Sequence, residues 1–282
     1  MKKSLFLILT YLLLNQLQAQ KIFSDNRQIM DAGNLAINTV EINIRRGILA
    51  AGGDYGGEWT RDIAINSWNA VSLLYPQIAE NSLWSVTLQK DTVAHQYWDK
   101  ILWAVAALNH YYTTGDQEFL EQASRCSENT MHQLEILAFD KEYGLFKGPA
   151  VFADGIAGYP EPVFDKYNFS SYVLDHHAAN IKCLSTNCLY YGAYLALAEM
   201  ASILKKEPQT IENYKHKGDL LKTSILKHFY NESEHKLNYL IDEAGKVHAF
   251  QEAMGYSFAV IFGVLTPAQS YDLSRNAFVS AF

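Results

Sequence analysis

The sequence predicts an all-α fold in which antiparallel helical hairpins are arranged in a ring. Two observations support this fold class. Most of the chain follows the period of an amphipathic helix, and the expected helices alternate between two kinds. One kind is apolar nearly all round, which suits burial on both sides, whereas the other carries most of the Lys, Glu and Gln and suits an outer layer facing water.

The expected helices of the inner and outer kinds follow one another along the chain. Pro76 should stop the first inner helix, and a short amphipathic piece around residues 78–86 follows it. The inner helices are expected at residues 59–75, 95–113, 184–205 and 252–264, and the outer ones at 27–46, 117–137 and 208–230, with a last helix at 267–278.

Two segments depart from the helical pattern. Residues 236–250 favour a small β-hairpin with its turn at Asp242 to Gly245. Residues 140–180 are rich in Gly, Pro and aromatic residues and are expected to be irregular. A connection this long without secondary structure is usually functional or disordered, and its aromatic content argues against disorder.

The N-terminal residues have the order of a secretory signal peptide. In MKKSLFLILTYLLLNQLQAQ two lysines precede an apolar run, and small residues follow it. The apolar run is short for a membrane span of about 20 residues. We therefore expect a signal peptide at residues 1–19, a secreted or periplasmic location and no membrane association after cleavage, with an uncleaved anchor as the alternative. Residues 20–282 would form a single domain.

Composition narrows the classes of partner. The chain has 23 Lys and Arg against 30 Asp and Glu, a formal net charge of −7. This balance disfavours nucleic acid, because phosphate binding needs clustered cations. Cys126, Cys183 and Cys188 have no zinc-binding spacing and are expected to be buried thiols, or one disulfide and a leftover thiol. We expect neither a metal site nor a cofactor.

Polar and aromatic residues gather at the starts of the expected inner helices. In a ring of antiparallel hairpins the inner helices run parallel, so their N-termini meet at one rim. Helix N-termini present free N–H groups that can bind hydroxyls or developing negative charge. The candidate binding residues at this rim are Trp59, Arg61, Asp62, Gln96, Asp99, Asn187 and Tyr191, and Glu252 is a candidate catalytic carboxylate.

Each candidate also has a purely structural interpretation. Asp62 would pair with Arg61 or Arg46, Asn187 would cap a helix, Tyr191 would belong to the core, and Glu252 would be a first-turn residue favoured by the helix dipole. The irregular segment adds Asp154, which has small neighbours, and Glu161, which lies between two prolines. A carboxyl on such a loop can approach a substrate oxygen closely, or Asp154 only builds a turn with Gly155.

Four stretches together resemble the six-hairpin glycosidases. They are GEWTRDIA at residues 57–64, QYWDKILW at 96–103, GLFKGPAVFADG at 144–155 and LSTNCLYYGAYLALAEM at 184–200. This superfamily of (α/α)6 toroids includes glucoamylases, trehalases, processing α-glucosidases and bacterial α-rhamnosidases. The resemblance spans most of the chain after residue 19, and its most specific part is the Trp-x-Arg-Asp element.

The resemblance implies an inverting glycoside hydrolase. Trp59, Arg61 and Asp62 would hold the sugar next to the scissile bond, and Asp154, with Glu161 second, would be the general acid. Inversion requires two carboxyl groups roughly 6.5–9.5 Å apart, with a water between one of them and the sugar. The substrate would be an oligosaccharide or glycoside.

Length is the departure from the superfamily pattern. The sequence supports about four inner helices, whereas a closed toroid has six. We therefore expect an incomplete ring, truncated at its C-terminal end, in which Glu252 is the base or the base lies downstream. Exposed inner helices would lower solubility or favour dimerisation. The alternatives are a toroidal polysaccharide lyase or sugar epimerase and a non-catalytic glycan-binding protein. A carboxylate-rich rim disfavours the lyase.

Overall fold

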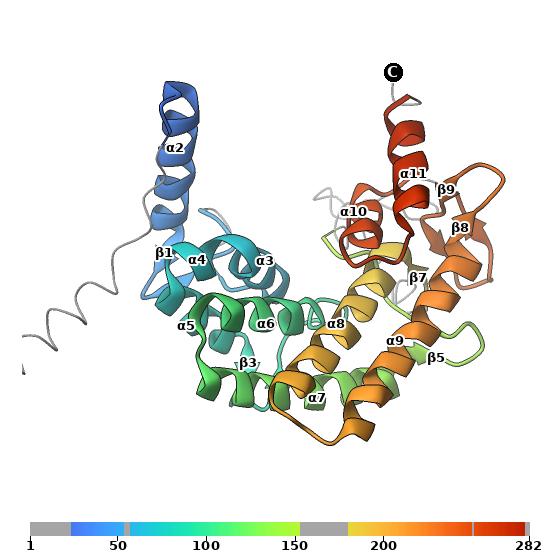
Figure 1. Cartoon of the computed structure of the whole chain (residues 1–282), viewed down its shortest axis with the longest axis horizontal. Coiled ribbons are helices and arrows are strands. Elements are labelled where there is room, and N and C mark those ends of the chain that lie inside the picture. The colour runs from blue at the N-terminus through green and yellow to red at the C-terminus, as the bar shows by residue number, and fades with distance from the viewer. Residues whose placement is uncertain (1–23, 54–56, 153–179, 250, 280–282) are drawn as a thin grey trace, which may run out of the picture.

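The structure, a computed structural model, describes residues 24–53, 57–152, 180–249 and 251–279. Within these ranges the chain is mainly helical, and short two-residue strands lie between the helices (Figure 1). The helices are α2 (Arg27–Asn43), α3 (Thr60–Asn66), α4 (Ser72–Leu74), α5 (Pro76–Ser85), α6 (Leu102–Thr114), α7 (Gln117–Ala138), α8 (Leu184–Ile203), α9 (Pro208–Phe229), α10 (Ala253–Ile261) and α11 (Pro267–Val279), with a π-helical segment, Ser67–Val71, joining α3 to α4.

The inner layer consists of α3, α6, α8 and α10, which contact one another in chain order. Helix α8 shows why a helix apolar on all sides belongs here. Nearly all its side chains from Leu184 to Ala201 are buried, because α6 and α10 flank it and α9 and α7 cover it. The prediction of an all-α toroid with buried inner helices is confirmed.

The outer layer covers the inner helices from one side. Helix α5 packs on α6, α7 packs on both α6 and α8, and α9 packs on α8. Helix α7 has the one-sided pattern expected for such a position, with a capping bond from the N–H of Phe119 to Asp116. Its buried residues are Phe119, Leu120, Ala123, Ser124, Cys126, Ser127, Thr130, Met131, Leu134 and Ala138.

A small antiparallel hairpin follows each outer helix and leads to the next inner helix. This repeated unit places the starts of the inner helices at the same rim of the array, as the sequence predicted. The pairs are β1 (Ile44–Arg45) with β2 (Ile48–Leu49) after α2, β3 (Thr87–Leu88) with β4 (Thr92–Val93) after α5, β5 (Phe139–Asp140) with β6 (Leu145–Phe146) after α7, and β8 (Tyr230–Asn231) with β9 (Lys236–Leu237) after α9.

The predicted hairpin within residues 236–250 is confirmed with a shift in its start. Strands β10 (Leu240–Ile241) and β11 (Val247–His248) pair across a turn in which the Gly245 N–H donates to the carbonyl of Asp242. Lys236–Leu237 belongs instead to the preceding β8–β9 pair. Strand β7 (Lys182–Cys183) pairs with β10, so this sheet ties the start of α8 to the segment before α10.

Two helix boundaries differ from the prediction. Helix α6 begins at Leu102 and not near residue 95, because His95 has a φ of 69° and cannot continue a right-handed helix. Residues 96–101 form tight turns, such as the bond from the Asp99 N–H to the Gln96 carbonyl. Pro76 ends α4 as expected, but it is also the first residue of α5, where its missing N–H costs nothing.

Helix α2 stands apart at one end of the array, and α10 and α11 lie at the other end (Figure 1). No residue of α2 is buried, and its apolar side chains Ile29, Leu35 and Ile42 are exposed. Among the helices that the structure describes, none is both long and apolar enough to cross a membrane.

Candidate functional site

Five of the predicted rim residues lie together around Arg61, in the first turn of α3. The Arg61 guanidinium donates from Nη1 to Asp99 Oδ2 at 2.7 Å and to Gln96 Oε1 at 3.2 Å. Its Nε lies 3.7 Å from Asp62 Oδ2, and its Cζ lies 4.9 Å from the centre of the Trp59 ring. We call Trp59, Arg61, Asp62, Gln96 and Asp99 the arginine cluster.

The charged residues of the arginine cluster differ in how deeply they are buried. The Asp99 side chain is fully buried, whereas the side chain of Asp62 keeps 30% of its surface exposed and that of Arg61 17%. Asp99 therefore holds the guanidinium in place from the protein interior and has no exposed surface that a ligand could contact. Asp62 does pair with Arg61, as its structural interpretation held, but the separation is too long for a hydrogen bond and leaves the carboxylate accessible.

A second cluster surrounds Glu252 at the start of α10. Both carboxylate oxygens are buried, and they lie close to Ser185 and to the backbone of Gly255. Burial raises the pKa of Glu252 to about 7, and these neighbours of Glu252 oppose the rise. A carboxyl that titrates near neutral pH can act as a general acid or base.

Gly255 allows this close arrangement. A Cβ at Gly255 would lie 2.7 Å from Glu252 Oε2 and 2.7 Å from Leu184 Cδ2, so any side chain here would displace the carboxylate or α8. The neighbouring thiols of Cys183 and Cys188 are also fully buried, which raises their pKa well above the usual value. We call Glu252, Ser185, Cys183, Cys188 and Tyr239 the Glu252 cluster; all three cysteines of the chain are free thiols.

Tyr97 connects the two clusters along the rim. It follows Gln96 in the chain, and its ring lies 3.3 Å from the position of a Cβ on Gly148. Burial, with a smaller contribution from the nearby Cys183, raises the pKa of Tyr97 to about 12. Its neutral hydroxyl can therefore both donate and accept a hydrogen bond near neutral pH.

Two predicted binding residues serve the fold instead. Asn187 is fully buried: its Oδ1 accepts from the Phe146 N–H at 2.7 Å, and its Nδ2 donates to the carbonyls of Phe146 and Cys183. These bonds engage both polar atoms of the Asn187 side chain and hold β6 against α8. Tyr191 packs against Gly218 of the outer helix α9, with Lys222 Nζ 5.9 Å from its ring centre, so it belongs to the helix interface, as its structural interpretation held.

The loop carboxyls Asp154 and Glu161 lie outside the described residues. The sequence analysis selected neither Tyr97 nor Ser185, although both lie next to or near selected residues in the chain, and it did not select Tyr239. The sequence around Tyr239 shows only the alternating pattern of a β-strand, which gives no sign of a functional site. The structure places Tyr239 beside the start of α8, where its carbonyl accepts a hydrogen bond from the Leu184 N–H. Among the described residues, no three His, Cys, Asp or Glu are grouped so that they could hold a metal ion.

Three solved structures with a similar fold are described as proteins that act on or bind sugars. A rhamnosidase from Klebsiella oxytoca with rhamnose bound is 13% identical, with a TM-score of 0.67, over 92% of this chain and 48% of the other. A GH63 mannosylglycerate hydrolase from Thermus thermophilus in complex with glucose is 14% identical, with a TM-score of 0.65, over 86% and 74%. A sugar epimerase from a ruminal bacterium is 11% identical, with a TM-score of 0.56, over 90% and 67%.

The sequence itself matches no protein-family model and no curated protein. The chain spans about half the length of the Klebsiella rhamnosidase and 22% of a GH78 rhamnosidase from Bacillus sp. GL1. At these identities the similarity establishes the architecture alone: this chain shares the α/α-toroid fold of those solved structures.

Proposed function

We propose that this chain is a glycoside hydrolase, or the part of one that carries the sugar-binding rim. The observation that carries the proposal is the arginine cluster, in which a fully buried Asp99 fixes Arg61 beside an aromatic ring and an accessible carboxylate. A sugar offers an apolar face and several hydroxyls, which match the ring of Trp59 and the charged groups of Arg61 and Asp62. The fold shared with solved rhamnosidase and GH63 hydrolase structures supports the same conclusion.

In the proposed reaction Glu252 is the base and Asp154 the acid, with Glu161 as the second candidate. The acid gives its proton to the leaving glycosidic oxygen as the bond to the anomeric carbon breaks. The base takes a proton from a water whose oxygen bonds to that carbon from the opposite face, so the configuration inverts. The raised pKa of Glu252 favours proton uptake at this step.

We also propose a secreted or periplasmic location, reached through a signal peptide at residues 1–19. This location suits hydrolysis of glycans outside the cytoplasm. Tyr97 adds a hydroxyl to the proposed binding surface, whereas Asn187 and Tyr191 are left out of it because of their contacts in the fold.

The test is hydrolysis of a panel of aryl α- and β-glycosides and disaccharides by the chain without residues 1–19. We expect turnover of at least one substrate, a loss of about 10²-fold or more in kcat for Asp154→Asn and for Glu252→Gln, and weaker sugar binding for Arg61→Ala. Lys215→Glu, a change on the outer helix α9, is the control. Sugar binding without turnover would contradict the hydrolase proposal and leave a glycan-binding protein.

A sugar epimerase is the second candidate, because the ruminal bacterial epimerase structure matches 90% of this chain. An epimerase removes and returns a proton on a sugar carbon, so it incorporates deuterium from D₂O into a free sugar without cleaving a glycosidic bond. Product analysis by NMR in D₂O separates the two activities, since a hydrolase generates a new reducing end instead.

A further inference from the structure

A large cavity lies on the outer wall of the described chain and not at the rim. It occupies about 840 Å³ between α7 and α9, and its floor is formed in part by Tyr194 of the inner helix α8. This volume falls within the range of roughly 300–1,000 Å³ that is usual for small-molecule sites. We call it the outer groove. Nothing in the arginine or Glu252 clusters lines it.

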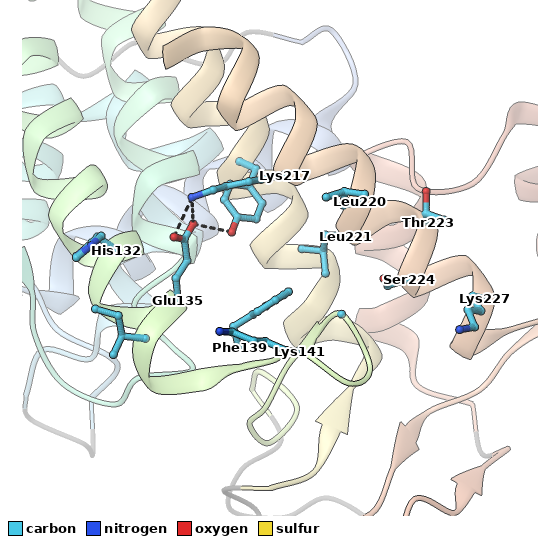
Figure 2. Close-up of a pocket in the computed structure, with 13 residues that line it drawn as sticks. His132, Glu135, Phe139, Lys141, Lys217, Leu220, Leu221, Thr223, Ser224 and Lys227 are labelled. Atoms are coloured by element: carbon cyan, nitrogen blue, oxygen red, sulfur yellow. Dashed lines mark hydrogen bonds and ion pairs between the residues drawn. The ribbon is translucent and has the colours of Figure 1, made fainter. Parts of the chain in front are cut away.

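Helices α7 and α9 each present one face to the outer groove. Helix α7 contributes residues with helical spacing, and α9 does the same, so the lining belongs to the regular structure and not to loose loops. Figure 2 shows lining side chains from both helices, with Glu135 and Lys217 pointing towards each other. The lining residues from the two helices are His132, Glu135, Ile136 and Phe139 on α7 and its end, and Lys217, Leu220, Leu221, Thr223, Ser224 and Lys227 on α9.

The single acidic group in the described lining of the groove is already neutralised. Glu135 accepts from Lys217 Nζ at 2.8 Å and 2.9 Å and from the Tyr194 hydroxyl at 2.8 Å. The dashed lines in Figure 2 mark the contacts of Glu135 with Lys217. This network fixes α7 to α9 at one end of the groove, and its charges cancel.

The remaining charged groups of the groove are cationic. Lys141 and Lys227 line it, are exposed and form no ion pair within the described ranges. Asp140, which precedes Lys141 in the chain, forms an ion pair with Lys182 at 3.0 Å. The described lining of the groove therefore carries more positive than negative charge, above an apolar floor that includes Phe139 and Leu221, although the chain has a net charge of −7.

We propose that the outer groove binds a small amphiphile with one carboxylate or similar anionic head and an apolar body. The body would lie on Phe139, Leu220 and Leu221, where its burial gives about 25 cal/mol per Å² of apolar surface. The head would lie between Lys141 and Lys227. Charge complementarity selects an anionic over a neutral or cationic ligand. This site is independent of the rim and of the proposed hydrolase activity.

The test uses decanoate, decanol and butyrate as probes in calorimetric titrations of the chain below micellar concentrations. We expect saturable binding of one decanoate per chain, weaker binding of decanol, which lacks the charge, and still weaker binding of butyrate, which lacks most of the apolar body. Reversing both cations with Lys141→Glu and Lys227→Glu should weaken decanoate binding about tenfold or more, since each exposed charge contact is worth up to about 1 kcal/mol.

The control is Lys215→Glu, which reverses one charge on α9 away from the groove lining, half the charge change of the double variant. It should change decanoate binding by less than about twofold. Both lysines of the test variant are exposed, so the fold should survive, and circular dichroism checks this. Equal affinity for decanoate and decanol, an equal loss in the Lys215 variant, or no saturable decanoate binding would each overturn the proposal.

Discussion

Asp99 and Arg61 are 38 residues apart in the chain, and their contact organises the rim. Burying a carboxylate costs free energy unless a cation and hydrogen bonds compensate the charge. Asp99 therefore needs the Arg61 guanidinium as its partner, just as Arg61 needs Asp99 to hold it in position. The fixed guanidinium also lies over the ring of Trp59, with Arg61 Cζ 4.9 Å from the ring centre.

Removal of Asp99 should therefore be costly to the fold. We expect Asp99→Ala to lower the free energy of unfolding by about 2–4 kcal/mol, because it leaves Arg61 without its buried partner. The control is Asp62→Ala, whose charge is partly exposed and 3.7 Å away, and it should cost less than about 1 kcal/mol. Urea denaturation of the three proteins measures both values, and equal costs would contradict the positioning role of Asp99.

Glu252 gives the second prediction at this scale. Its pKa is raised from 4.5 to about 7, so the folded chain binds this proton more tightly than the unfolded chain does. The stability that comes from this group is complete below about pH 4.5 and is lost as the pH rises through about 7. The difference in the free energy of unfolding between Glu252→Gln and wild type should therefore depend on pH. It should favour Glu252→Gln by on the order of 3 kcal/mol more above about pH 8 than below about pH 4.5.

Denaturation at several pH values measures this difference, with the exposed Glu121→Gln as a control that should follow the wild-type curve. If the wild-type and Glu252→Gln curves run parallel across this pH window, Glu252 is not a buried carboxyl in solution.

At the scale of elements, α8 is the helix on which the site depends, because its first turn carries Ser185 and its middle packs against the end of α10. A Cβ at Gly192 would lie 2.7–2.8 Å from three atoms of the Phe262 ring. That ring also stacks on Trp68 of the π-helical segment, with centres 5.6 Å apart and planes 4° apart, so it has little room to move.

Gly192→Ala should consequently destabilise the protein by about 1–3 kcal/mol, although Ala favours a helix by about 1 kcal/mol over Gly. Gly53→Ala is the control, since a Cβ there meets nothing within 4 Å. Thermal unfolding compares the two variants. A neutral or stabilising effect of Gly192→Ala would mean that α10 can shift away from α8 at low cost.

At the scale of the whole molecule, the described helices form repeated outer–inner units in which α2 at one end buries no side chain. The exposed apolar residues on α2, together with Val260 and Ile261 on α10, are the kind of surface that favours association. The expected tendency towards low solubility or dimerisation stays a prediction. The contact between Trp68 and Phe262 shows that the first and last inner units also meet each other.

The sequence by itself determined the all-α toroid, the order of outer and inner helices and the presence of Trp59, Arg61 and Asp62 at a helix start, because hydrophobic periodicity and helix-end signals are local. Only the tertiary structure decided that Asp99 is a buried partner, that Asn187 and Tyr191 serve the fold and that Glu252 is desolvated, since burial depends on segments far apart in the chain. The turns at residues 96–101 were missed because a backbone conformation such as that of His95 leaves no trace in hydrophobic periodicity. The outer groove likewise arises from the packing of α7, α8 and α9, whose one-sided patterns do not reveal how they fit together.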